Sequence, residues 1–252
     1  MTTTLIVLAH PEPRSFNAAW AEATRAACAA AGDRVLRSDL VQMGFDPVEA
    51  ARHYRDTGDA FDPLKAQETA AAAGTIPADV AAELEKLRAA DRVIFHFPVW
   101  WFGPPAILKG WFDRVLMHGA THSVDERFDT GRFRGRRALF CVTTGSRATE
   151  SGFDGREGDI SMLLWPLAYA LRYLGFTVLE PELVHGVHGY HREARKAELE
   201  ARLRTVLDGQ ARVIAGLPAR AAIPFNADSD FDGAGRLLPD RPSYSGFIRH
   251  EG

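Results

Sequence analysis

The chain has 252 residues, 46% of them hydrophobic and 25% charged, which is close to average globular usage and argues against intrinsic disorder. Its length corresponds to one large domain, or to one domain with an appendage. Thirty Lys and Arg residues face 33 Asp and Glu residues, and the resulting net charge of −3 gives no support to a nucleic-acid or anionic-membrane partner.

The sequence gives no sign of a disulfide framework, a signal peptide or a membrane-spanning segment. Cys28 and Cys141 are too few for a disulfide framework. No basic segment precedes the first apolar run, as it would in a signal peptide. The longest apolar stretch, residues 162–171, is half of the ~20 residues that a membrane span needs. We therefore expect a cytoplasmic protein without a membrane span.

Strand and helix signals alternate along the chain. Ser15 or Asn17 can cap the first helix, and Pro166 is expected to bend or interrupt a later one. In chain order, we expect a strand at 4–9, a helix at 15–31, a strand at 33–40, helix within 64–90, a strand at 91–98, a helix at 105–117, a strand at 137–144, a helix at 159–174, a strand at 176–180 and a helix at 191–215.

This alternation predicts an α/β domain with a mainly parallel sheet and right-handed crossovers. We place that domain at residues 1–217. Residues 218–252 contain several Gly and Pro residues and no clear periodicity, so we expect an irregular C-terminal extension rather than a second domain.

Ligands of an open parallel sheet bind beyond the carboxyl ends of its strands, and three segments of unusual composition occupy such ends. The first is residues 10–17, between a strand and a helix N-terminus, where Arg14, Ser15 and Asn17 offer donors to a phosphate. The glycines of a dinucleotide fingerprint or a P-loop are absent. A phosphate site and an ordinary capped turn both remain open for this segment.

The other two segments can likewise be interpreted either as ligand-binding loops or as ordinary structural turns. Residues 98–105 place Trp100, Trp101 and Phe102 in a proline-flanked turn, where they can stack on a planar ligand or fill the core. Residues 143–146 are small and carry hydroxyls and a glycine, which allows close backbone approach to a ligand or forms a simple turn. Three such loops at one edge of a sheet favour a ligand site.

The histidines give weaker signals. His96 lies inside an expected strand, and we interpret it as a packed core residue. His185, His188 and His191 could suggest a metal site, but no Cys or carboxylate lies at a recognisable offset, so a solvated loop is favoured. No GxSxG elbow or Cys-His signature supports covalent hydrolysis.

Four segments together resemble the NAD(P)H:quinone oxidoreductase family: LIVLAHPEPRSFN, DRVIFHFPVWWFGPPAILKGWFDRV, CVTTG and SMLLWPL, in the family's order between residues 4 and 215. The resemblance implies a flavodoxin-like, doubly wound, five-stranded parallel sheet with helices on both faces. It also implies FAD rather than FMN as cofactor, NAD(P)H as co-substrate, a quinone-like acceptor and a homodimer.

The resemblance also implies roles for individual residues, each at a position that matches a family motif. Trp101, Phe102 and Gly145 would border the reacting part of the flavin. Trp101 and Phe102 would also line the substrate site, together with His122 and Val124. The implied cofactor contacts are His10, Ser15, Phe16 and Asn17 for the phosphates; Pro98, Val99, Trp100, Trp101 and Phe102 along the flavin ring; Thr143, Thr144, Gly145 and Ser146 at its pyrimidine end; and Arg195 for the adenosine part.

The sequence departs from the family at two of these places. Ser151 and Glu157 stand where the family keeps a Tyr and a His beside the pyrimidine end of the flavin. His122 and Val124 stand where it keeps two substrate-facing tyrosines. We count Ser151 and Glu157 among the catalytic candidates, and Arg147 or Arg156 could neutralise the carboxylate.

The sequence therefore predicts an FAD-dependent NAD(P)H dehydrogenase of the quinone type. One alternative keeps the flavin and changes the acceptor to an azo or nitro compound. Others are a flavodoxin-like electron carrier without a substrate of its own and a flavin-free binding protein.

Overall fold

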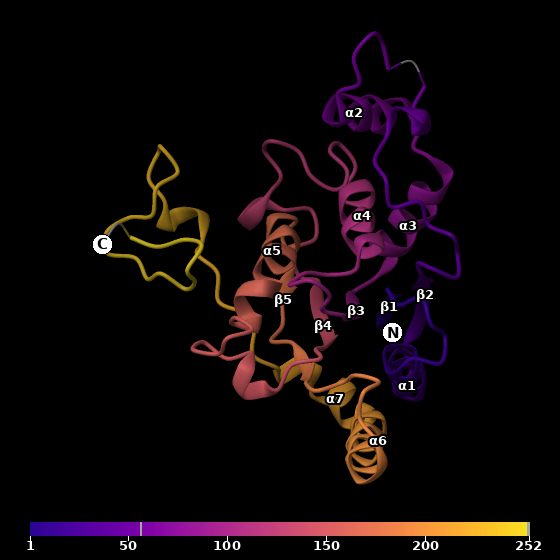
Figure 1. Cartoon of the computed structure of the whole chain (residues 1–252). Coiled ribbons are helices and arrows are strands. Elements are labelled where there is room, and N and C mark those ends of the chain that lie inside the picture. The colour runs from indigo at the N-terminus through magenta and orange to yellow at the C-terminus, as the bar shows by residue number, and fades with distance from the viewer. Residues whose placement is uncertain (56, 251–252) are drawn as a thin grey trace.

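A computed structural model describes residues 1–55 and 57–250 and has a parallel sheet at its centre (Figure 1). The strand order is β2-β1-β3-β4-β5, and the short β6 also pairs with β4. All pairings are parallel, as the alternating elements predict. The strands are β1 (Thr3–Leu8), β2 (Arg34–Asp39), β3 (Arg92–Pro98), β4 (Arg137–Thr143), β5 (Thr177–Val178) and β6 (Glu182–Val184).

Helices cover both faces of the sheet (Figure 1). One face packs against α1 (Phe16–Ala30), α6 (Glu193–Asp208) and α7 (Gln210–Gly216). The other packs against α3 (Ala78–Ala89), α4 (Ala106–Val115) and α5 (Ile160–Tyr173), with α2 (Pro63–Ala73) beyond them. This arrangement confirms the flavodoxin-like, doubly wound prediction.

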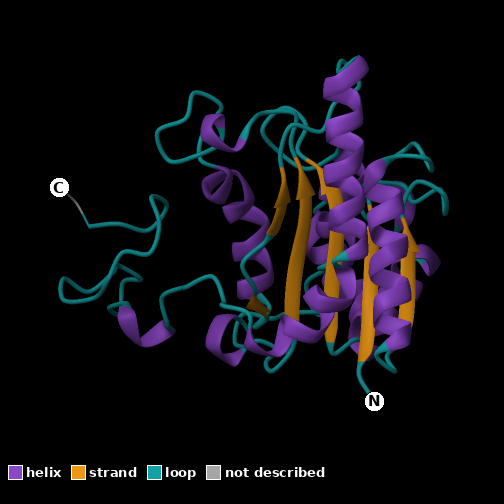
Figure 2. Cartoon of the chain, turned by 90° about the horizontal axis from the view of Figure 1, so that it is seen from below, coloured by secondary structure: helices purple, strands orange, loops and turns teal. Residues whose placement is uncertain are grey.

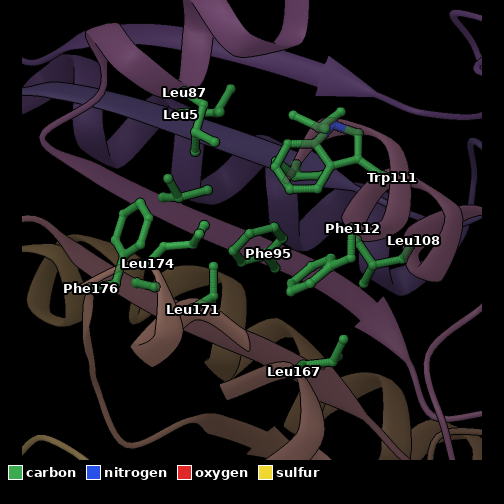
Figure 3. Packing of buried hydrophobic residues seen from close by; sticks show 14 of the residues in the cluster. Leu5, Leu87, Phe95, Leu108, Trp111, Phe112, Leu167, Leu171, Leu174 and Phe176 are labelled. Carbon is green, nitrogen blue, oxygen red and sulfur yellow. The ribbon is translucent and has the colours of Figure 1, made fainter. Parts of the chain in front are cut away.

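The larger core cluster is centred on β3 (Figure 3). The Phe95 ring packs against Trp111 and Phe112 of α4, at centroid distances of 5.8 and 5.6 Å. Leu171 of α5 closes the cluster from the other side. β1, β3 and β4 are almost wholly buried, which explains why their sequences are continuous apolar runs.

Three expected elements differ from the structure. The strand predicted at 176–180 is only β5, and pairing with β4 resumes after Pro181 as β6, because Pro181 has no N–H for the ladder. The single helix predicted at 191–215 is divided at Gly209 into α6 and α7. α5 continues through Pro166 without interruption.

The segment after α7 is irregular, as predicted, with short 3₁₀ turns at Leu217–Ala219 and Asp228–Asp230 (Figures 1 and 2). It begins against the sheet edge, where Ile223 N–H donates to Val178 O at 2.8 Å. It then packs on α5, with the Phe225 ring 5.0 Å from Trp165. The domain boundary at residue 217 stays a prediction.

Over residues 1–55 and 57–250, no helix is both long and apolar enough to cross a bilayer.

Candidate active site

The three loops that the sequence singled out meet at one edge of the sheet. Strand order reverses between β1 and β3, the position where doubly wound sheets bind ligands. Asn17 Nδ2 donates to Thr143 Oγ1 at 2.9 Å, and Val99 N–H donates to Thr143 O at 2.8 Å. The rings of His10 and Trp100 lie edge to face, 5.7 Å apart. Segments far apart in sequence thus build one candidate site.

α1 begins with the geometry of an anion site. Ser15 is its N-cap, and Ser15 Oγ accepts from Ala18 N–H at 3.2 Å. The N–H groups of Phe16 and Asn17 have no partner within the helix, and no acidic side chain occupies the first turn. The positive end of the helix dipole and these free donors suit a phosphate group.

His10 adds an oriented donor beside this helix end. Glu12 N–H donates to His10 Nδ1 at 3.1 Å, so the ring proton is on Nε2. Burial lowers the pKa of His10, which keeps the ring neutral near pH 7. His10 and Ser15 border a cavity of about 590 Å³.

The aromatic loop is a tight hairpin that begins where Pro98 ends β3. Trp100 N–H donates to Gly103 O at 2.9 Å, and Gly103 N–H returns a bond to Trp100 O at 3.1 Å. The two residues between them, Trp101 and Phe102, have φ angles of 49° and 61°. Aromatic residues rarely adopt this left-handed conformation, which costs about 1–3 kcal/mol each and concentrates at functional sites. Trp101 is 95% exposed, so it is not a core residue.

A cavity of about 460 Å³ separates this hairpin from the loop after β4. Trp101 and Phe102 line one side, and Gly145 and Ser146 line the other. A Cβ added to Gly145 would meet no atom within 4 Å, so the loop backbone is open to a ligand. Ser151 also lines this cavity; it is almost fully buried, and its hydroxyl lies 2.5 Å from Ser146 Oγ.

Two carboxylates also border this cavity. Glu150 accepts from Arg147 N–H at 3.0 Å and from Arg156 at 3.1 Å, and these bonds hold the pKa of Glu150 below its usual value. Arg156 Nε lies 3.7 Å from Glu157 Oε1. The structure therefore pairs Glu157 with Arg156, one of the two cations proposed from the sequence.

The substrate-facing candidates are separated from each other. His122 lines a cavity of about 570 Å³ that shares Phe102 with the cavity at Gly145. Burial, with His118 and Arg132 nearby, lowers the pKa of His122 to about 4. Val124 lines a different cavity, of about 450 Å³, against the C-terminal extension.

Arg195 lies in the first turn of α6, a helix that packs against α1 but has no buried residue. Its side chain lines none of the four cavities described above. The structure therefore brings the three loops together and leaves Arg195 at their periphery.

Comparison with known proteins decides the family. Residues 2–207 match the family described as flavodoxin-like fold. NAD(P)H dehydrogenase [quinone] 1 of Rattus norvegicus is 41% identical over 211 residues, which cover 80% of this chain and 76% of the relative. The chain belongs to the NAD(P)H:quinone oxidoreductase family. The ribosyldihydronicotinamide dehydrogenase [quinone] of Mus musculus is 38% identical over 201 residues. The aligned region covers 77% of this chain and 86% of the relative.

A solved structure from Klebsiella pneumoniae that carries the name quinone reductase has the same fold. It superposes with a TM-score of 0.82 at 32% identity and covers 95% of both chains. An azoreductase from Bacillus anthracis, at 19% identity and a TM-score of 0.57, shares the fold alone. The enzyme family that the sequence segments suggested is therefore confirmed.

The residues of this quinone oxidoreductase fit a flavin in two respects. Phe16 and Asn17 offer free N–H donors to phosphate groups, and the buried Asn17 Oδ1 has no hydrogen-bond partner in the described part of the chain. The open backbone at Gly145 opposite the Trp101 ring leaves a slot for a planar group.

The structure agrees with the interpretation of His96 and differs from that of His185. His96 is fully buried in β3 against Trp20, as expected of a core residue. His185 was wrongly interpreted as part of a solvated loop: it is partly buried, and its Nδ1 lies 3.0 Å from Thr144 Oγ1. Only the parallel pairing of β4 with β6 brings these residues together, and the sequence did not reveal β6.

Proposed function

We propose that this protein is an FAD-dependent oxidoreductase that transfers two electrons from NAD(P)H to a quinone-like acceptor. One observation carries the proposal: loops from β1, β3 and β4 meet at the reversal of strand order and enclose a slot between an aromatic hairpin and an open backbone. The quinone dehydrogenases among its relatives support the same activity.

The start of α1 holds the phosphates in this proposal. The phosphates would be bound by neutral hydrogen-bond donors rather than by charged side chains. These donors are the N–H groups of Phe16 and Asn17, the Ser15 cap and the Nε2 proton of His10. Arg195, on the helix that packs against α1, contacts the adenosine part. This second contact region is why we propose FAD in place of FMN.

The hairpin and the loop after β4 orient the planar ring. Trp101 and Phe102 cover one side of the slot, and the backbone at Gly145 and Ser146 borders the other. When bound, the flavin accepts a hydride from NAD(P)H at N5 and passes two electrons to the acceptor. Strain in the hairpin keeps the aromatic rings at the slot before substrate arrives.

An apolar acceptor suits the neighbouring cavity. Phe102 connects it to the slot, and its other walls include Phe112, Leu167 and Tyr173. His122 is neutral near pH 7, because its pKa is about 4, and it offers hydrogen bonding without charge. These features favour a flat, uncharged ring with carbonyl oxygens, as in a quinone.

The purified protein provides a direct test. We expect the absorption spectrum of a flavin, release of FAD on heating, and NAD(P)H oxidation with a quinone in the absence of any partner protein. Release of FMN alone would overturn the FAD assignment. A faster reaction with azo or nitro compounds would change the acceptor class, and a colourless protein that cannot be reconstituted with flavin would overturn the proposal.

We also propose that two copies of the chain associate. Trp101 and Phe153 are almost fully exposed, and Phe102 and Trp100 are exposed for about half of their surface. Aromatic patches of this kind usually mark an interface. A second copy that covers the patch would complete the wall of each site.

A further inference from the structure

The loop after β4 is held from behind, on the side away from the slot. Thr144 N–H donates to Val184 O at 3.1 Å, and Gly186 N–H donates to Ser146 O at 2.8 Å. The parallel pairing of β4 with β6 therefore continues past both strands. One edge of the loop backbone is fixed in this way, while Gly145 and Ser146 border the slot.

The side chain of His185 adds a contact from the same segment. Its Nδ1 lies 3.0 Å from Thr144 Oγ1, and that hydroxyl donates its only proton to Ser146 O at 3.1 Å. Thr144 Oγ1 is left to accept, so the proton is on His185 Nδ1, which donates. Arg202 of α6 donates to the carbonyl of His185 at 2.6 Å. A continuous chain of hydrogen bonds thus runs from α6 to the loop.

The contact is a polar one at the edge of the fold. His185 is only partly buried, and its ring nitrogen faces the Thr144 hydroxyl. Burial and the nearby Arg202 lower the pKa of His185, so the ring is a neutral donor near pH 7. Thr144, which receives this hydrogen bond, is itself buried and immediately precedes Gly145.

We propose that His185 is a positioning residue of the oxidoreductase: by holding the Thr144 hydroxyl it sets the position of Gly145 and Ser146 against the pyrimidine end of the flavin. The proposal rests on the function proposed above. His185 does not touch the slot, since it is absent from the slot's lining. It acts through Thr144, and Arg202 holds its backbone in place.

Two substitutions at the same position test this role. His185→Phe keeps a ring and removes the donor, whereas His185→Asn places an amide N–H close to the position of Nδ1. We expect His185→Phe to weaken flavin binding by the apo-protein about tenfold, the value of one hydrogen bond, and to shift the midpoint potential of the bound flavin. We expect His185→Asn to restore both. Thr144→Val also removes the bond from Thr144 Oγ1 to Ser146 O, so we expect it to weaken flavin binding at least as much as His185→Phe, and the double variant should lose less than the sum of the two single losses.

His188→Phe is the matched control, since this residue lies in the same segment and its hydrogen bond and ring contacts in the described residues are to Tyr190 and His191, not to the loop. It should leave flavin affinity and potential unchanged. Equal affinity and potential in His185→Phe and the wild type would overturn the proposal, and so would equal losses in His185→Phe and His185→Asn, which indicate packing. A wild-type protein that binds no flavin would instead overturn the proposed function, before any variant is compared.

Discussion

Trp101 combines a strained backbone with an exposed side chain. Its ring is 95% exposed, and its φ of 49° is a conformation that an L-residue adopts at a cost of about 1–2 kcal/mol. No gain from burial offsets this cost in the single chain. The strained hairpin is therefore best explained by what Trp101 contacts when substrate is bound.

Trp101→Ala and Trp101→Gly form a matched pair that tests this explanation. Both remove the ring, and we expect both to lower kcat/KM for a quinone by about tenfold, because a stacked aromatic contributes about 1 kcal/mol or more. Only glycine relieves the left-handed strain, so Trp101→Gly should unfold at a higher temperature than Trp101→Ala. Normal turnover in both variants, measured by steady-state kinetics, would contradict the substrate role.

Glu157 is the residue where this enzyme departs most from the family pattern. Its side chain borders the slot near Gly145, and within residues 1–55 and 57–250 its one ion-pair partner is Arg156, at 3.7 Å. A negative charge near the pyrimidine end opposes the charge that a reduced flavin acquires. In the proposed flavin site, the Arg156 guanidinium would offset part of that effect.

We expect Glu157→Gln to raise the midpoint potential of the bound flavin, by on the order of 20 mV for a partly exposed charge, and to change the rate of its reduction by NAD(P)H. Arg156→Gln should lower the potential, because it leaves the carboxylate unpaired. Potentiometric titration of both variants measures the two shifts. Unchanged potentials would place this ion pair outside the site and leave the backbone of Gly145 and Ser146 as the stabilising group.

At the scale of elements, the sequence predicted what depends on local pattern. β1, β3 and β4 were placed within one or two residues, because strands buried on both faces are continuous apolar runs between turn residues. Of the two capping residues that the sequence offered for α1, Ser15 and Asn17, the structure has Ser15 as the N-cap. What failed depends on pairing partners: β6 has three residues and no local signal, and its existence is set by β4.

The same distinction applies to the candidate site. Composition singled out the three loops, but not their mutual contacts, such as the bond between Asn17 and Thr143. It could not reveal the left-handed turn at Trp101 and Phe102, since aromatic residues do not favour that conformation. The role of His185 was missed for a related reason, because its partner lies 41 residues earlier in the chain.

The packing of α1 on β3 contains an unusual polar pair. His96 and Trp20 are fully buried with ring centroids 5.4 Å apart, and neither His96 nitrogen nor Trp20 Nε1 has a hydrogen-bond partner in the described residues. Burial lowers the pKa of His96 to about 3. The folded protein thus excludes a proton that the unfolded chain accepts near pH 6.5.

This difference predicts acid sensitivity. Above pH 6.5 both states are neutral at His96. As pH falls from 6.5 toward 3, only the unfolded chain is protonated, and the free energy of unfolding decreases by about 1.4 kcal/mol per pH unit. We expect His96→Leu to reduce this slope and to leave a protein at least as stable at pH 7.5, because it removes unpartnered polar atoms. Urea unfolding at pH 7.5 and 5.0 measures both effects, with the exposed His250→Leu as control. An unchanged slope would show that folded His96 takes up the proton.

At the scale of the whole molecule, the exposed aromatic residues and the incomplete acceptor site have one common explanation. Val124, which the family resemblance assigns to the substrate, lines a cavity apart from the one at Gly145 within a single chain. In the dimer proposed above, a second copy would add walls to that slot and cover Trp101, Phe102 and Phe153, which are exposed in the single chain.

We therefore expect light scattering to give a particle of twice the 27.7 kDa of one chain. Dilution through the dissociation constant should lower the specific activity in parallel with the dimer fraction, because the monomer lacks part of the acceptor wall. Phe153→Ser, which changes an exposed aromatic side chain outside the lining of the slot, should weaken association if this residue lies in the interface and leave the flavin spectrum intact. A 27.7 kDa particle that keeps full activity at every dilution would show that each chain carries a complete site, and the exposed hairpin would then serve the substrate alone.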